Sequence, residues 1–113
     1  MPVPAPVLSV VIPAYNNGRT LGETLASVLA QDVDGLEVIV ADHSSSDNTV
    51  DVMRGVQTDP RVTLLETPAG GGAARNWNRV TDAARGEFVK LVCGDDVLRP
   101  GTLARQLDLL RST

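Results

Sequence analysis

Short apolar segments alternate with amphipathic segments four times along this chain, and that alternation limits the folds it can adopt. The apolar segments are residues 7–12, 37–41, 61–65 and 88–93. Apolar runs of this length, bounded by turn residues, are typical of buried strands, and the segments between them repeat apolar residues at helical spacing. Because strand–helix alternation implies parallel strands joined by right-handed crossovers, we expect an α/β fold with four mainly parallel strands.

Sequence signals at the helix ends refine this prediction. Thr20 and Glu23 have capping-box spacing before the first helix, and Pro100 fits the first turn of the last one. The third strand, residues 61–65, is more polar than the others, so we expect it near a sheet edge. The residues expected on buried helix faces include Leu21, Leu25 and Val28, then Trp77, Val80 and Ala84, and finally Leu103, Leu107 and Leu110.

The composition argues against several classes of protein. A formal net charge of -4 does not suit a nucleic-acid binder, which needs a basic face. One cysteine, Cys93, and one histidine, His43, are too few for an intrachain disulfide or a zinc cluster of these residues. No segment is long and apolar enough to span a membrane, and residues 1–6 resemble an extended leader rather than a signal peptide. We expect a cytoplasmic protein whose single domain covers residues 7–113.

Acidic residues follow two of the expected strands. Asp95 and Asp96 come after residues 88–93, and Asp42 comes after residues 37–41. The carboxyl ends of parallel strands lie at one sheet edge, where ligands bind. Adjacent carboxylates repel one another and are the hard oxygen ligands that divalent cations prefer. Either Asp42 or Asp96 alone would more simply cap a turn, but the three acids together indicate a site.

Three glycines, Gly70 to Gly72, precede the third expected helix. The dinucleotide fingerprint does not fit, because its sixth position is Arg75 and the loop follows the third strand instead of the first. A P-loop is excluded because glycine-lysine-serine and glycine-lysine-threonine are absent. The glycines suit a flexible turn as well as a functional loop. Arg75 favours the interpretation as a functional loop, because a guanidinium near a helix N-terminus can bind a pyrophosphate.

Four segments in order resemble the family 2 glycosyltransferases. They are Val-Ile-Pro-Ala-Tyr-Asn at residues 11–16, the serine-rich loop at 42–49, the segment at 71–76, and residues 86–96. The resemblance extends from Leu8 to Leu110. It implies a GT-A fold, with a Rossmann-like nucleotide-binding half, that binds a nucleotide-diphosphate sugar with Mg²⁺ or Mn²⁺ on the diphosphate.

The same resemblance implies roles for individual residues. The positions that match nucleotide-binding residues of the family are Pro13, Ala14, Tyr15, Asp42, Arg75 and Asp95, and the matching metal ligand is Asp96. Tyr15 would stack on the base while Asp42 accepts a hydrogen bond from its N–H edge. Asp95 would contact the ribose.

The chain departs from the family pattern at two positions and lacks a third element. Cys93 and His43 stand where the family often has acidic residues. The family's general base is a later carboxylate, and neither Glu87 nor Asp108 lies in a motif that could replace it. We therefore expect the donor-binding part of a glycosyltransferase that transfers a sugar to an unknown acceptor, inactive by itself and prone to self-association through an exposed sheet edge.

Three other functions stay open. A nucleotidyltransferase would carry a glycine-rich basic loop after the first strand, where this chain has residues 13–17. A phospho-acceptor signalling domain would need an acidic pair there, where this chain has Pro13. A catalytically inactive nucleotide-binding or interaction module is compatible with the sequence as it stands.

Overall fold

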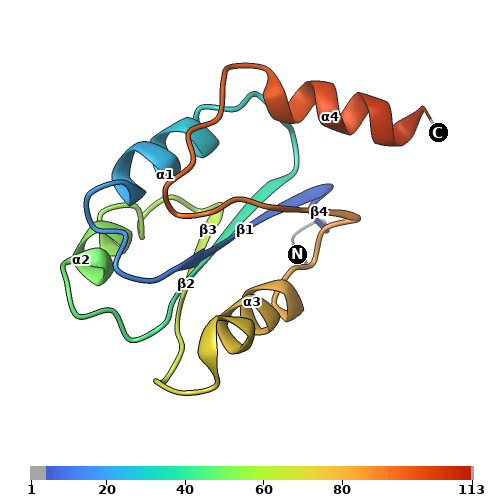
Figure 1. The fold of residues 1–113 in the computed structure, drawn as a ribbon. Helices are drawn as coiled ribbons and strands as arrows, with labels where there is room; N and C mark the ends of the chain where they lie inside the picture. Colours follow the sequence, from blue (N-terminus) through green and yellow to red (C-terminus); the bar gives the residue numbers. More distant parts are fainter. Residues whose placement is uncertain (1–4, 113) are drawn as a thin grey trace.

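Four parallel strands form one sheet in the order β3-β2-β1-β4 in the computed structural model, which describes residues 5–112 (Figure 1). The strands are β1 (Leu8–Ala14), β2 (Leu36–Asp42), β3 (Val62–Glu66) and β4 (Phe88–Leu91). The helices are α1 (Leu21–Leu29), α2 (Thr49–Arg54), α3 (Gly72–Asp82) and α4 (Thr102–Arg111). The predicted α/β fold is thus confirmed, and most of the expected leader lies outside the described residues.

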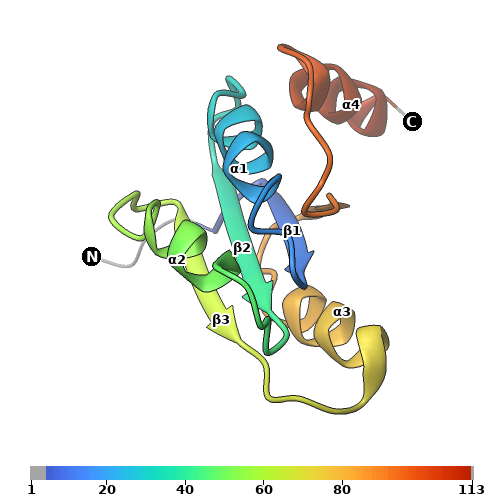
Figure 2. The same ribbon diagram turned by 60° about the vertical axis from the view of Figure 1, so that its left-hand side comes forward.

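Helices cover the two faces of the sheet unequally. Figures 1 and 2 show α1 and α2 on one face and α3 by itself on the other. Alternate residues of β1 serve the two layers, because Val10 and Ile12 pack with Leu25 of α1 whereas Val11 packs with Val80 of α3. Leu103 of α4 joins the same core as α1, Leu107 is also buried, and the C-terminal end of α4 projects from the body (Figure 1).

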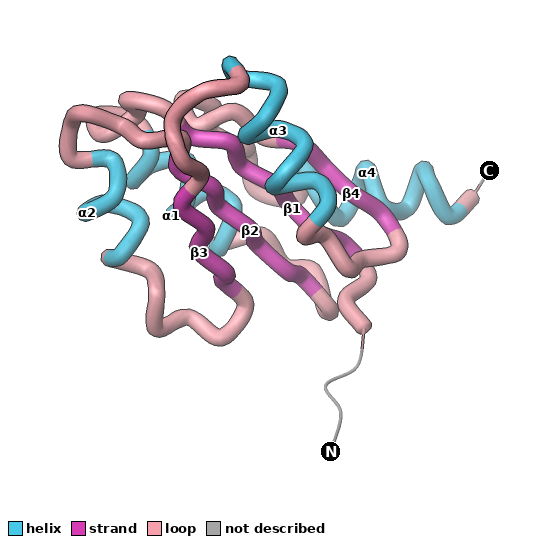
Figure 3. The backbone as a smooth tube through the Cα atoms, turned by 90° about the horizontal axis from the view of Figure 1, so that it is seen from below, coloured by secondary structure: helices cyan, strands magenta, loops and turns pink. Residues whose placement is uncertain are grey.

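The two central strands are buried along their whole length, and the two outer strands are not. All seven residues of β1 and all seven of β2 are buried. Both outer strands, β3 and β4, contain half-buried and exposed residues, so the prediction that the third strand lies at an edge is confirmed. Figure 3 shows α3 lying across this sheet. No helix among residues 5–112 is long and apolar enough to cross a membrane.

The first strand does not end at residue 12, where the predicted strand segment ended. β1 continues through Pro13 to Ala14, and Pro13 pairs in register with Ala41 of β2. The backbone of Val11 faces β4, since its carbonyl accepts a hydrogen bond from Val92 N. Alternate residues of a strand face the same neighbour, so Pro13 also faces that side, beyond the last β4 residue in the ladder, Leu91. The missing N–H of proline therefore removes no ladder hydrogen bond.

Some predicted helix features are wrong. Trp77 is 44% exposed, and the buried residues of α3 are Asn76 and Val80. Asn76 lies one turn before Val80 and points at the sheet because its amide bonds there, which places Trp77 about 100° away around the helix.

Pro100 precedes α4 instead of entering its first turn, because the helix starts after Gly101, whose φ is 80°. Leu110 is 48% exposed, since this end of α4 extends past the sheet.

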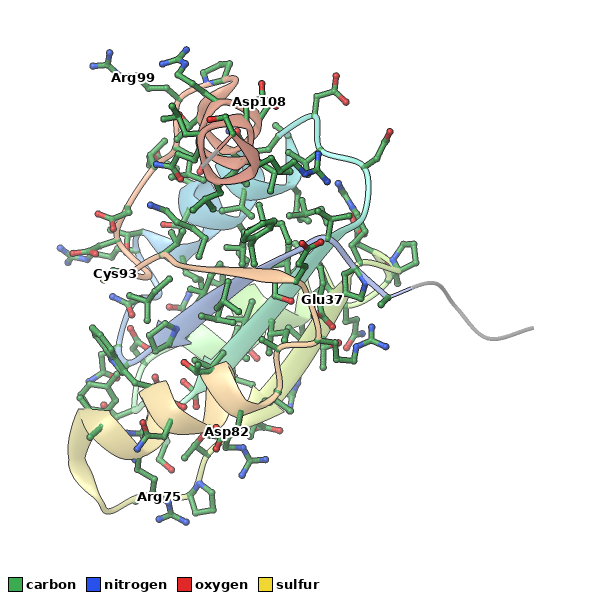
Figure 4. All side chains as sticks on the ribbon, turned by 90° about the vertical axis from the view of Figure 1, so that its right-hand side faces the viewer. Glu37, Arg75, Asp82, Cys93, Arg99 and Asp108 are labelled. Carbon is green, nitrogen blue, oxygen red and sulfur yellow. The ribbon has the colours of Figure 1, made fainter. Side chains whose placement is uncertain are left out.

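An ion pair between buried Glu37 and exposed Arg85 ties three segments together at the amino ends of the strands, the opposite end of the sheet from Cys93 (Figure 4). Glu37 Oε2 accepts hydrogen bonds from Ser9 Oγ at 2.5 Å and Arg85 N at 3.0 Å, and Glu37 Oε1 accepts one from Arg85 Nε at 2.9 Å. Burial acts to raise the pKa of Glu37, but the hydrogen bonds from Ser9 and Arg85 outweigh it and lower the pKa below its ordinary value of 4.5.

This linkage gives a pH-dependent prediction for Glu37→Gln. Because the pKa of Glu37 is lower in the folded state, its stabilisation is present above the unfolded-state value and is lost as pH falls through the folded one. We expect the variant to lower the free energy of unfolding by about 1–3 kcal/mol at neutral pH. Urea denaturation should show this deficit shrinking as the pH falls below 4.5. An equal deficit in acid would contradict the assignment.

Candidate functional site

The strand order reverses beside β1, and this reversal places the candidate site. The chain runs from β1 through β2 to β3 and then returns to pair β4 with the other side of β1. In open parallel sheets, ligands bind outside the carboxyl ends of the strands at such a switch point. Tyr15, Asp42, and the segment Cys93–Asp96 follow or end three neighbouring strands at this edge. The predicted convergence of the strand-end residues on one edge is therefore present.

The loops after β1 and β2 are fastened to each other by side chains. Asn16 N donates to Ser45 Oγ at 2.8 Å, and Asn16 Oδ1 accepts from Ser46 N at 2.9 Å. Asn17 N donates to Thr49 Oγ1 at 2.9 Å. These polar side chains replace the ladder bonds that irregular backbone lacks.

Asp42 orders its own loop. Its side chain is almost fully buried, and the carboxylate accepts hydrogen bonds from Ser45 N at 3.2 Å and from the Ser45 hydroxyl. Its backbone carbonyl accepts from Thr67 N at 2.6 Å, which joins this loop to the one after β3. The bonds within the loop fit the simple turn-cap interpretation. Each carboxylate oxygen still has a second lone pair, but Asp42 is buried and does not line the cavity beside it, so recognition of a base by Asp42 stays a prediction.

A cavity of about 440 Å³ opens between the loops after β1, β2 and β3. The residues that line it are Tyr15, His43, Ser44, Ala69, Gly70, Gly72 and Ala73. The Tyr15 side chain is 60% exposed, and its ring meets that of His43 edge-on at a centroid distance of 6.4 Å. A cavity of this size, with an exposed aromatic ring and small apolar residues in its wall, suits a planar heteroaromatic group.

Residues 69–72, which we call the glycine loop, have a defined conformation. Gly70, Gly71 and Gly72 have φ values of 101°, 77° and 66°, a left-handed region that side chains disfavour. A Cβ on Gly71 would also lie 2.8 Å from Cδ and 2.9 Å from Cβ of Arg75. Gly71 therefore permits both the turn and the packing of the arginine stem.

Arg75 holds the loop instead of lining the cavity. Its NH1 donates to Ala69 O at 3.1 Å, and Figure 4 shows the residue near the start of α3 at the surface of the molecule. The cavity-lining residues do not include it. The contact between Arg75 and a diphosphate therefore stays a prediction.

The acids after β4 form a compact cluster with Cys93. The ligand atoms of Cys93, Asp95 and Asp96 all lie within 4.8 Å of one another. Both carboxylates are exposed, and neither forms an ion pair with any residue in the range 5–112. Burial, reinforced by the charges of Asp96 and Asp95, raises the pKa of the Cys93 thiol. The carboxylates are thus the hard ligands here, and this donor set suits a cation such as Mg²⁺ that also binds ligand phosphates.

Gly94 connects this acidic loop to the rest of the site. Its carbonyl accepts hydrogen bonds from Thr20 Oγ1 at 2.8 Å and Thr24 Oγ1 at 3.1 Å. The predicted capping box is therefore wrong, because the Thr20 hydroxyl bonds to Gly94 and not to α1. Asn17 Oδ1 accepts from Tyr15 N at 2.9 Å, and a Cβ on Gly94 would lie 2.6 Å from that oxygen.

Asn76 is a positioning residue that the sequence analysis missed. It is buried in α3, where Oδ1 accepts from Thr67 Oγ1 at 2.7 Å and Nδ2 donates to Ala41 O at 2.8 Å. These bonds fix the helix that follows the glycine loop onto β2. The available signal was a polar amide at a helix position one turn before the apolar Val80.

Comparisons with known proteins agree on one family. The sequence profile described as Glycosyl transferase family 2 matches residues 9–113. A mannosyltransferase from Pyrobaculum calidifontis, solved with GDP-Man and Mn²⁺, superposes with a TM-score of 0.85 and 31% identity, covering 94% of this chain and 32% of that one. S. aureus TarS in complex with UDP-GlcNAc gives 0.85 and 28%, with coverages of 94% and 31%.

A curated relative gives the same result. GalNAc(5)-diNAcBac-PP-undecaprenol beta-1,3-glucosyltransferase of Campylobacter jejuni is 38% identical over 101 residues, which are 88% of this chain and 33% of that protein. The chain spans less than half of the length of the curated relatives compared with it, between 10% and 42%.

Gly94→Ala tests the connection between the acidic loop and Tyr15. The added methyl group would collide with Asn17 Oδ1, so we expect a loss of about 1–3 kcal/mol in unfolding free energy and altered amide shifts at Tyr15. Gly22→Ala is the matched control, because its nearest neighbour would be Val52 Cγ1 at 3.8 Å. Within α1 that control should stabilise the chain by about 0.5–1 kcal/mol. Unchanged Tyr15 shifts in Gly94→Ala would refute the connection.

Proposed function

Because this chain belongs to glycosyl transferase family 2, we propose that it binds a nucleotide-diphosphate sugar together with Mg²⁺ or Mn²⁺ for transfer of the sugar to an acceptor hydroxyl. Nucleotide sugars accompany the two similar structures, UDP-GlcNAc in TarS and GDP-Man with Mn²⁺ in the mannosyltransferase. The chain corresponds to the donor-binding part of such an enzyme.

One observation supports this proposal above the others. The cavity is lined by an exposed aromatic ring that follows β1. The neighbouring strand, β4, is followed by a pair of carboxylates without cationic partners among residues 5–112. The Asn17 side chain lies between the two loops, because its Oδ1 accepts a hydrogen bond from Tyr15 N and lies close to the backbone of Gly94. A nucleoside diphosphate has the matching parts, a planar base at one end and a metal-binding diphosphate at the other.

The proposed roles follow the geometry of the loops. Pro13 and Ala14 end β1 and deliver Tyr15, whose exposed ring stacks on the base. Asp42 uses a remaining lone pair for the N–H edge of that base. Arg75 supplies positive charge at the start of α3, where backbone N–H groups also favour an anion.

At the acidic loop, Asp96 holds the cation and Asp95 contacts the ribose. A divalent cation bound there would neutralise the charge that develops on the leaving diphosphate. The donor-side residues bind and orient the sugar nucleotide, but activation of the acceptor also needs a base. Glu87 directly precedes β4, at the opposite sheet edge, and Asp108 lies on the projecting α4. We therefore propose that this chain alone binds the donor without transferring the sugar.

Asp96→Asn tests the metal role. The amide keeps the size of the side chain but removes its charge, so we expect the Mn²⁺-dependent part of UDP or GDP affinity to fall at least about tenfold in calorimetry. Asp108→Asn, an exposed charge on α4, should leave that dependence unchanged. Equal metal dependence in wild type and Asp96→Asn would disprove the assignment.

Tyr15→Ala tests the base-stacking role. Loss of one stacked base should weaken nucleotide affinity by about 1–3 kcal/mol, which is roughly 5- to 150-fold. Tyr15→Phe keeps the ring and should retain most of the affinity. If Tyr15→Ala binds UDP and GDP as tightly as the wild type, the aromatic ring is an exposed bystander.

A further inference from the structure

The segment that forms one wall of the cavity depends on side chains for its shape. This segment is the glycine loop, residues 69–72. Thr67 O, just before it, accepts from Ser44 Oγ at 3.0 Å, and Ala69 O accepts from Arg75 NH1 at 3.1 Å. Gly70 O accepts from His43 Nε2 at 2.9 Å. Within residues 5–112, no backbone-to-backbone hydrogen bond reaches residues 68–70.

Two of these bonds, those from Ser44 and His43, join the loop after β2 to the segment after β3, and the one from His43 reaches a glycine that lines the cavity. His43 follows β2 and Gly70 follows β3, and both residues line the cavity. Arg75 and Ala69 are only six residues apart, so their bond is local to the turn into α3. A carbonyl oxygen can only accept, so Nε2 of His43 carries the proton of this hydrogen bond.

We propose that His43 is a positioning residue, which holds the glycine loop in the shape that completes the nucleotide cavity and thereby raises nucleotide affinity. This inference rests on the proposed function. Three consecutive glycines have wide backbone freedom when they are unrestrained. A bond that orders them before binding reduces the entropy that the nucleotide would otherwise lose to the loop.

The bond also explains what His43 does at a position where the family often has an acid. A carboxylate there could not donate to Gly70 O, whereas a neutral imidazole donates through Nε2 and packs its ring against Tyr15. The same side chain therefore contacts residues from two further loops of the site.

Three substitutions at this position separate the donor from the ring. His43→Phe keeps a ring beside Tyr15 but removes the donor. His43→Gln restores an N–H group at a similar reach, and His43→Ala removes both in a smaller side chain that cannot clash. Thr81→Ala is the matched control, because it also deletes a side-chain-to-backbone hydrogen bond, but one that lies within α3, from Thr81 Oγ1 to Trp77 O at 2.7 Å.

Two measurements report the effect of these substitutions on the glycine loop and on nucleotide affinity. Hydrogen–deuterium exchange of residues 69–72 in the nucleotide-free chain reports loop order, and calorimetry with UDP or GDP and MnCl₂ reports affinity. We expect His43→Phe and His43→Ala to speed exchange in the loop and to weaken affinity about three- to tenfold, the size of one hydrogen bond. His43→Gln should recover both properties, and Thr81→Ala should change neither.

Unchanged loop exchange in both His43→Phe and His43→Ala would overturn the proposal, as would unchanged nucleotide affinity in a chain whose loop has loosened. Failure of His43→Gln to recover any loop protection would also overturn it, because the donor would then not be the cause. If the wild type binds neither UDP nor GDP while His43→Phe loosens the loop, the proposed function fails and with it the effect on affinity, whereas the hydrogen bond keeps its role in ordering the loop.

Discussion

The pairing of β1 with β2 on one side and with β4 on the other is the constraint on which the rest of the structure depends. Ala14 lies opposite Asp42 in the parallel register, so the ends of β1 and β2 finish at the same level. Both strands are buried throughout, and a slip of one residue would turn every side chain to the wrong face. Burial of the sheet therefore fixes where the site loops begin.

The two ends of the sheet use charge in opposite ways. At the amino edge, Glu37 is buried and neutralised by Arg85, which ties β2 to the turn before β4. At the carboxyl edge, Asp95 and Asp96 are exposed side by side, and neither pairs with a cation among the described residues 5–112. Unpaired neighbouring carboxylates repel each other, so a divalent cation would relieve the repulsion there. This contrast is the physical basis for proposing a metal site at the carboxyl edge.

The fold and the family membership support the candidate site, but they do not by themselves establish its activity. Parallel α/β sheets carry many unrelated activities, so the activity must be argued from the side chains at the switch point. We propose that in this chain those side chains serve the donor side of a transfer reaction, whereas the carboxylates of Glu87 and Asp108 lie elsewhere in the fold.

The sequence by itself determined the α/β class, the parallel strands, the edge position of the third strand and the loops that carry the candidate residues. These features follow from apolar spacing and turn chemistry, which act over a few residues. It also supported the family, through four motifs in order, which the profile match over residues 9–113 confirmed.

Only the tertiary structure decided which polar atoms are already engaged. The Thr20 hydroxyl bonds to Gly94, 74 residues away, instead of capping its helix, and Asn76 displaces Trp77 from the buried face of α3. His43 contacts Gly70 across 27 residues. Such partners are invisible to local periodicity, because a hydroxyl, amide or imidazole bonds whichever group the packed sheet brings within about 3 Å, regardless of its distance along the chain.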